Sequence, residues 1–341
     1  MRKLLLGVLA VFLVFATFAL LWFFEENRSG IVSPLISSFT RTTPVPSVSV
    51  NKYAPLAFMA LSERKYQSEI KIGVATRNEA KYATHVFTYK SDGKTVSGMA
   101  NIPKGKGPFP VIVLLRGHVD REVYYIGHGT EKQANYYAEH GFLTLAPDFL
   151  GYGESDGEDQ DILVARFTRP VTVLNLLAGI KSLPQADSSR IGLWGHSNGG
   201  QIALSVLEIT KKNYPTSLWA PVSLGFPQSV LVYLGREEVG NPVKEKIDSF
   251  IREGNDTKAY SIAEYLDRIT APFIIHQGTD DELIETQWTK DLANNLKKRM
   301  LEANYYEYKG ENHNFNRYKT TADVLRQRDV EFFQQKLDVS R

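Results

Sequence analysis

The stretch that decides the fold is Ile191-Gly192-Leu193-Trp194-Gly195-His196-Ser197-Asn198-Gly199-Gly200. It reads as a short apolar strand that ends in Gly-x-Ser-x-Gly, and residues 202–211 then continue with apolar side chains at helical spacing. Glycines on both sides of Ser197 let the backbone turn tightly, so the hydroxyl can meet a base on one side and a substrate carbonyl on the other. The pattern predicts a serine nucleophile; the alternative is an ordinary glycine-rich turn with an exposed serine.

Beyond residue 54, predicted strands alternate with predicted helices. The strands are residues 85–90, 95–100, 110–115, 142–145, 190–194, 272–275 and 305–308. The helices are residues 131–140, 171–183, 202–211, 286–300 and 321–337, the second of them placed after Pro170. The continuous apolar runs are typical of strands buried on both faces. The expected fold is therefore α/β, with a mostly parallel central sheet flanked by helices.

Composition excludes several classes of function. The 341 residues carry 40 Lys and Arg against 38 Asp and Glu, a net charge of +2, so no nucleic-acid partner is expected. The chain has no cysteine, which excludes disulfides and thiolate metal sites. No residues have metal-ligand spacing, and we expect neither a metal nor another cofactor.

The N-terminal segment differs from the rest of the chain. Residues 4–24 are apolar and uncharged, with Arg2 and Lys3 before them and two glutamates after them. As a helix this stretch is roughly 31 Å long, enough to cross a bilayer. Residues 1–27 are therefore predicted to be a membrane anchor, with the body of the protein outside the cytoplasm. The alternative is secretion after cleavage of a signal peptide.

Three further segments follow the anchor. Residues 28–52 are rich in Ser, Thr and Pro and predict an extended stalk. Residues 53–341 are the predicted catalytic domain. Within it, residues 227–271 form a mixed, charged stretch between two predicted strands, and we expect a small cap or lid there.

A serine nucleophile needs a base and an acid, and the chain supplies candidates for both. The predicted strand 272–275 runs into a loop that contains Asp280 and Asp281, and His313 lies in a loop after the last predicted strand. The order serine, acid, histidine is that of α/β-hydrolases.

From about residue 53 onward, the chain resembles the α/β-hydrolase domain of the prolyl oligopeptidase family, particularly its small bacterial members. The matching stretches are residues 89–93, 110–115, 147–155, 194–200, 265–272, 278–281 and the loop around His313. The resemblance implies Ser197 as nucleophile, Asp281 as acid and His313 as base. Asp280 is the rival acid.

The resemblance also implies two backbone N–H groups that bind the oxyanion, from Asn198 and from His118. The family usually has His-Gly in the second loop, and Arg116 departs from that pattern. His196 and His276 are interpreted as packing residues, and residues 148–155 as loop architecture.

The substrate class follows from what the chain lacks. Too few residues lie between the predicted stalk and the strand at residues 110–115 for the β-propeller of full-size prolyl oligopeptidases, so we expect none, and no acidic pair is evident that would hold a peptide amino terminus. We expect a serine hydrolase that cleaves a small peptide or amide substrate, with a carboxylesterase as the alternative. A non-enzymatic binding protein of the same fold normally has a broken triad, and the presence of all three residues argues against it.

Overall fold

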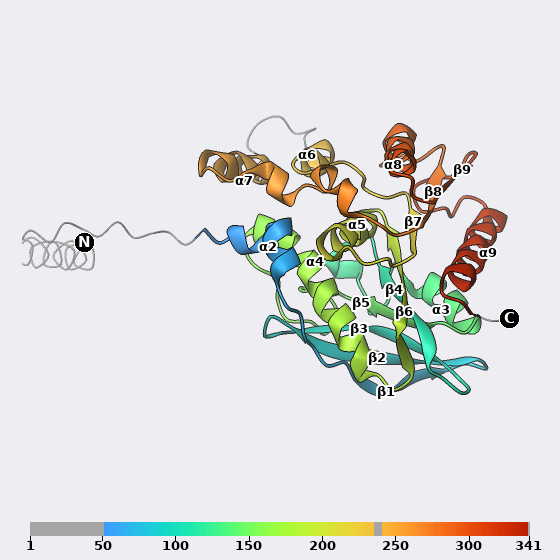
Figure 1. Ribbon diagram of the computed structural model, residues 1–341. Helices are drawn as coiled ribbons and strands as arrows, with labels where there is room; N and C mark the ends of the chain where they lie inside the picture. The colour runs from blue at the N-terminus through green and yellow to red at the C-terminus, as the bar shows by residue number, and fades with distance from the viewer. Residues whose placement is uncertain (1–50, 235–240, 340–341) are drawn as a thin grey trace, which may run out of the picture. The chain divides into compact units, whose positions relative to one another are not determined.

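A nine-stranded mixed sheet organises the computed structural model, which describes residues 51–234 and 241–339 (Figure 1). The strands are β1 (Lys71–Asn78), β2 (Tyr82–Ser91), β3 (Lys94–Pro103), β4 (Phe109–Leu115), β5 (Leu143–Pro147), β6 (Ala186–His196), β7 (Thr216–Trp219), β8 (Phe273–Gly278) and β9 (Ala303–Tyr308). Their spatial order is β1-β2-β3-β5-β4-β6-β7-β8-β9. The pairs among β1, β2, β3 and β5 are antiparallel, and all pairs from β5 through β4 to β9 are parallel.

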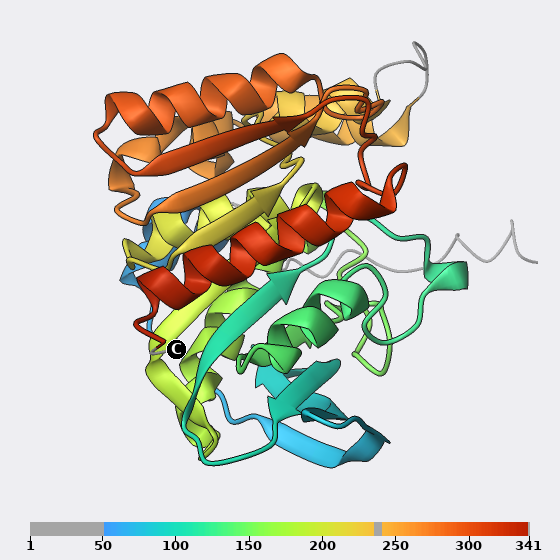
Figure 2. The same cartoon turned by 90° about the vertical axis from the view of Figure 1, so that its right-hand side faces the viewer.

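Helices cover both faces of this sheet, which explains the continuous apolar strands. The α-helices are α2 (Phe58–Glu63), α3 (Glu131–Glu139), α4 (Ile162–Gly179), α5 (Asn198–Thr210), α6 (Gln228–Leu234), α7 (Pro242–Arg252), α8 (Thr286–Lys298) and α9 (Lys319–Lys336). Val111 and Val113 of β4 pack in one core with α2, α4, α5 and α8, whereas Ile112 and Leu114 pack in another with α3 and α9. Figure 2 shows α9 crossing the sheet beside α3.

The predicted α/β fold is confirmed, and one predicted helix is wrong in its start. The segment predicted as residues 171–183 is α4, which begins at Ile162 and contains Pro170. Proline removes one backbone hydrogen bond from a helix. Here the loss is offset because Asp161 caps the helix, accepting from the N–H groups of Leu163 and Val164, and because most of the helix is buried. The sequence pattern also missed β1 and the four-residue β7.

Asp161 also joins α4 to two other parts of the chain. Its carboxylate lies 2.6 Å from the ammonium groups of both Lys52 and Lys246, and the Tyr53 hydroxyl donates to it over 2.8 Å. Burial alone would raise the pKa of Asp161, but the hydrogen bonds from Lys246, Lys52 and Tyr53 outweigh it and hold that pKa well below its usual range. The start of the body and α7 are thereby tied to the N-terminal end of α4.

A second buried carboxylate fixes α9 against the sheet. Asp329 is fully buried and accepts from the Tyr137 hydroxyl at 2.6 Å, the Ser217 hydroxyl at 2.6 Å and the Trp219 indole at 2.8 Å. His276 Nε2 lies 3.0 Å from the same carboxylate. These four partners come from α3, β7 and β8, so one side chain links three elements to α9. The packing role predicted for His276 agrees with this position.

The predicted cap lies between β7 and β8. Residues 227–271 contain α6, α7 and three short 3-10 turns, and an aromatic cluster joins them to α4. In that cluster the Phe167 ring lies 5.2 Å from the Phe226 ring and 4.4 Å from the Tyr260 ring, centroid to centroid. The boundaries of the cap as a unit stay a prediction.

The predicted anchor, residues 1–27, lies outside the described residues, and so does the stalk up to residue 50. Within the described part, one helical stretch, Ile162–Ser182, is long and apolar enough to cross a membrane, with a mean hydropathy of 1.3. It is 61% buried against the rest of the protein, as expected for a core helix.

Candidate active site

Ser197 occupies a strained turn between β6 and α5. Its φ of 53° and ψ of −120° are values that residues other than glycine rarely adopt. The surrounding backbone holds the turn: Ser197 N donates to Trp219 O, and Ser197 O accepts from the N–H groups of Gly200 and Val222, all at 3.0 Å. A Cβ at Gly199 would lie 1.9 Å from the Leu115 carbonyl oxygen, so only glycine fits there.

Asp281 and His313 form a hydrogen-bonded pair at the carboxyl end of β8. Both Asp281 oxygens lie 3.0 Å from His313 Nδ1, and the two side chains are 0% and 4% exposed. The carboxylate also accepts from Gln277 Nε2 at 2.9 Å and from the N–H groups of Leu283 and Ile284 at 2.9 and 2.8 Å. A carboxylate that accepts a hydrogen bond from Nδ1 keeps the imidazole proton on that nitrogen. Nε2 then has a free lone pair that can accept a second proton.

The charge of Asp281 is favoured by this geometry. Burial alone would raise the pKa of the carboxyl, but the hydrogen bond and the electrostatic attraction of His313 outweigh it, so the net pKa lies below its usual value. Asp281 is therefore ionised at neutral pH and stabilises positive charge on the imidazole.

Asp280 points elsewhere. Its carboxylate is 53% exposed and lies 2.7 Å from Arg317 Nη1. Of the two neighbouring acids, only Asp281 contacts His313, and this geometry supports the choice of Asp281.

His196 connects the serine turn to the histidine loop. Its Nε2 lies 3.0 Å from the His313 carbonyl oxygen, and the two rings are 4.8 Å apart. Burial and the nearby His313 lower the pKa of His196 to about 4, so its neutral ring donates Nε2–H to that carbonyl at neutral pH. Among the hydrogen bonds of the described residues, none joins the Ser197 hydroxyl to His313. Such bonds are often long in free enzymes and tighten when substrate binds.

The two predicted oxyanion donors lie beside the serine. Asn198 is the first residue of α5, where backbone N–H groups have no partner within the helix. His118 follows β4, and its side chain is 74% exposed beside Asp120. Both residues line, with Ser197, a hollow of about 380 Å³. Their roles stay predictions.

Arg116 fixes the loop that carries His118. Its guanidinium is buried and donates to the carbonyl oxygens of Gly117 and Asp148, both at 2.9 Å. It also lies 4.0 Å from the centre of the Tyr152 ring, close enough for a cation–π contact. Residues 148–155 thus support the loop that carries His118, in agreement with their predicted architectural role.

The hollow beside Ser197 is mostly apolar. Its walls come from α4, the cap, and the loops after β4, β7 and β8: His118, Ile162, Leu163, Arg166, Arg169, Ser197, Asn198, Val222, Ser229, Val230, Val243 and Leu283. Sequence reasoning missed the contribution of α4, since it placed residues 162–169 outside the helix. In residues 51–234 and 241–339, no group of three or more His, Asp or Glu side chains is placed to hold a metal ion.

Comparison with solved structures agrees with the α/β fold. Among solved structures, an acetyl xylan esterase from Paenibacillus sp. R4 has a TM-score of 0.60 at 17% identity, covering 80% of this chain and 91% of that one. A puromycin-hydrolyzing peptidase from Mycobacterium tuberculosis has a TM-score of 0.56 at 17% identity, covering 77% and 41%. These likenesses show the fold.

At the sequence level, an uncharacterized 31.7 kDa protein of Escherichia coli is 33% identical over 114 residues. The match covers 32% of this chain and 37% of that protein, so the chain spans little more than a third of the length of this relative.

The fold and the match to a family model define the class, a serine hydrolase of the α/β-hydrolase type, peptidase or esterase. The model of the prolyl oligopeptidase family matches residues 129–340, and the chain belongs to that family. The resemblance seen in the sequence is thereby confirmed.

Proposed function

We propose that this protein cleaves peptide or amide bonds through an acyl-enzyme formed on Ser197. The observation that carries the proposal is the buried Asp281–His313 pair, linked through His196 to the strained turn that presents Ser197. In the first step, His313 Nε2 takes the hydroxyl proton while Ser197 Oγ attacks the substrate carbonyl carbon. The imidazolium then gives that proton to the leaving amine, and the C–N bond breaks.

The second half of the reaction uses the same groups. Water loses a proton to His313 Nε2 and attacks the acyl carbonyl, and the proton returns to Ser197 Oγ as the acid leaves. In both halves the negative charge on the carbonyl oxygen is stabilised by the backbone N–H groups of Asn198 and His118. Asp281 holds the imidazole tautomer and stabilises its charged form.

A carboxylesterase is the second candidate, because the same steps expel an alcohol in place of an amine. The mostly apolar hollow favours it, since none of the residues that line the hollow in the described part of the chain is an acid that could hold a peptide amino terminus.

One experiment separates these possibilities. The purified enzyme is treated with a fluorophosphonate probe and then assayed on paired peptide arylamides and aryl esters with the same acyl part. Turnover of the arylamides supports the peptidase, turnover of the esters alone supports the esterase, and no labelling contradicts both. Ser197→Ala is the matched control.

We further propose that residues 1–27 anchor the protein in a membrane, with residues 28–52 as a stalk and the hydrolase body outside the cytoplasm. The support is the sequence, with a 21-residue apolar stretch between two basic residues and two acidic ones. A protein lacking residues 1–27 should be released in active form. N-terminal sequencing of the membrane fraction decides between the readings, because a start near Leu20 would mean a cleaved signal peptide.

A further inference from the structure

The hollow beside Ser197 contains two cationic side chains and no acidic one among the described residues that line it. Arg166 and Arg169 are three residues apart on α4, a spacing that places them on one face of a helix. The other lining residues are apolar or neutral apart from His118. An apolar hollow with a few polar groups is typical of a substrate site, and the polar groups then decide which substrate is bound.

Arg169 has no counter-charge of its own. In the described part of the chain its guanidinium makes no hydrogen bond and no ion pair, and burial lowers its pKa. The acid that acts on it most strongly is Glu158, whose carboxylate is already paired with Arg121. Removing a cation from water without a partner costs free energy. A ligand anion that pairs with the Arg169 guanidinium lowers this cost, and it does not compete with Glu158, which is already paired with Arg121.

Arg166 is oriented by hydrogen bonds to side chains of two neighbouring helices. Its Nη2 donates to Gln201 Oε1 of α5 and, over 3.1 Å, to Ser229 Oγ of α6. These bonds orient the guanidinium between α4, α5 and the cap. An oriented guanidinium is well suited to bind a carboxylate.

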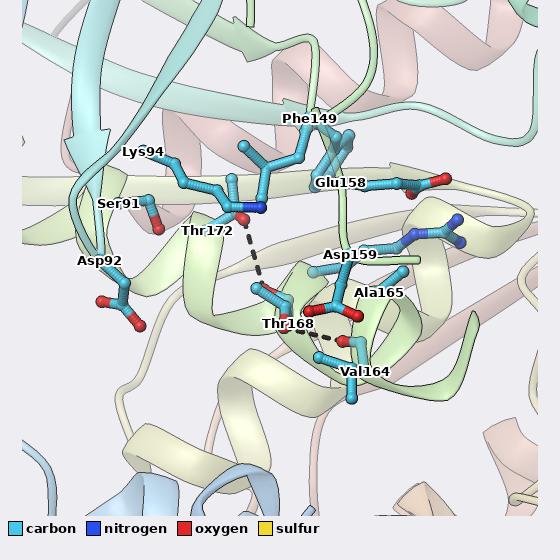
Figure 3. Close-up of a pocket in the computed structure, with 12 residues that line it drawn as sticks. Ser91, Asp92, Lys94, Phe149, Glu158, Asp159, Val164, Ala165, Thr168 and Thr172 are labelled. Atoms are coloured by element: carbon cyan, nitrogen blue, oxygen red, sulfur yellow. Dashed lines mark hydrogen bonds between the residues drawn. The ribbon is translucent and has the colours of Figure 1, made fainter. Parts of the chain in front are cut away.

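A second hollow, of about 170 Å³, is also lined by Arg169 and provides a contrast. It is lined by Lys94, Glu158 and Asp159 together with residues of α4, so its charges are of both signs. Figure 3 shows Glu158 and Asp159 above α4, where the Thr168 hydroxyl donates to Val164 O and the Thr172 hydroxyl to Thr168 O. Among residues 51–234 and 241–339, the walls of the Ser197 hollow thus carry positive charge and no acid, whereas the second hollow carries charges of both signs.

We infer that the substrate carries a carboxylate on the acyl part that occupies the Ser197 hollow, bound by Arg169 with Arg166 beside it. The inference rests on the proposed acyl-enzyme function and names its substrate class: peptides or esters with an acidic side chain close to the scissile carbonyl. No additional chemistry is needed, since the carboxylate binds without reacting.

The test compares three substrates that differ in one side chain. N-acetyl-Xaa-Ala aryl esters and arylamides, with Xaa as Glu, Gln or Lys, are assayed on the wild-type enzyme. We expect kcat/KM for Glu to exceed that for Gln by about tenfold or more and that for Lys by a larger factor, with the advantage falling as salt is added. Equal values for Glu and Gln would overturn the inference, and this comparison needs no variant.

Variants then assign the preference to α4. Arg169→Met should reduce the Glu-to-Gln ratio to about one, and Arg169→Lys should keep part of it because the charge remains. Lys94→Met, which changes a cation of the second hollow, is the matched control and should leave the ratio unchanged. If Arg169→Met lowers both substrates in parallel, the arginine is structural and the inference fails. Loss of fluorophosphonate labelling in the wild type would instead contradict the proposed function itself.

Discussion

The most informative single substitution is Asp281→Asn, because it keeps the shape of the side chain and changes only what it offers to His313. The buried carboxylate accepts one hydrogen bond from His313 Nδ1 over 3.0 Å and another from Gln277 Nε2 over 2.9 Å. An asparagine amide has one accepting oxygen and one donating NH2 group. In the variant, this NH2 group therefore faces either the Nδ1–H of His313 or the Nε2–H of Gln277, and two donors cannot bond to each other. The imidazole can relieve the conflict by moving its proton to Nε2, and that tautomer cannot accept the Ser197 proton.

The expected loss in kcat is on the order of 10⁴-fold, about 5.4 kcal/mol of transition-state stabilisation. The loop itself should survive, because the remaining oxygen can still accept from the N–H groups of Leu283 and Ile284, now 2.9 and 2.8 Å from Asp281. Stopped or continuous assays of an aryl ester, with the melting temperature measured in parallel, separate loss of catalysis from loss of folding.

Asp280→Asn is the matched control. The exposed ion pair of Asp280 with Arg317 contributes at most about 1 kcal/mol to stability and has no contact with His313. Its kcat should stay within about twofold of the wild type. A loss of less than tenfold in Asp281→Asn, or a larger loss in Asp280→Asn, would refute the assignment of the acid.

Three further predictions concern stability. Asp329→Ala removes the carboxylate that accepts from four buried donors, and it should lower the free energy of unfolding, measured by urea denaturation, by about 3–5 kcal/mol. A decrease below about 1 kcal/mol would contradict a stabilising role for these hydrogen bonds. His196 has a pKa of about 4 in the folded protein and about 6.5 in the unfolded chain, so between these values the unfolded chain binds more protons. The free energy of unfolding therefore falls as the pH drops from about 6.5 to 4, by at most about 3 kcal/mol. Melting curves of His196→Gln at pH 4–8 should lack this pH-dependent component. Glu208 is buried, and neither of its carboxyl oxygens is hydrogen-bonded among the described residues, so burial raises its pKa well above the usual value. Glu208→Gln should therefore stabilise the protein more at pH 8 than at pH 5. Equal shifts of the melting temperature at the two pH values would contradict an uncharged buried acid.

Local patterns in the sequence were sufficient to predict the framework. The apolar run of β4 gave a strand buried on both faces because consecutive side chains enter opposite cores, and Val111 and Ile112 do so. The Gly-x-Ser-x-Gly turn was predictable since a Cβ at Gly199 would collide with the backbone of β4. Both features depend on residues close together in the chain.

Other features depend on contacts between distant segments and could not be predicted in this way. Pro170 indicated a helix start, but the Asp161 cap and tertiary packing carry α4 through it. That error hid the face of α4 on which Arg166 and Arg169 lie. The choice of Asp281 over Asp280 came from the family resemblance alone, because two neighbouring acids do not reveal which of them the loop turns toward His313; the geometry supports that choice.

The role of Ser197 as nucleophile is tested by locating the covalent adduct of a fluorophosphonate probe by mass spectrometry of the digested protein. We expect a single adduct on Ser197, absent in a folded Ser197→Ala variant whose kcat is lower by about 10³-fold or more. His313→Gln should form the adduct far more slowly, because the base that activates the hydroxyl is missing. An unlabelled wild-type enzyme, or labelling and near-normal turnover that persist in Ser197→Ala, would show that Ser197 is not the nucleophile.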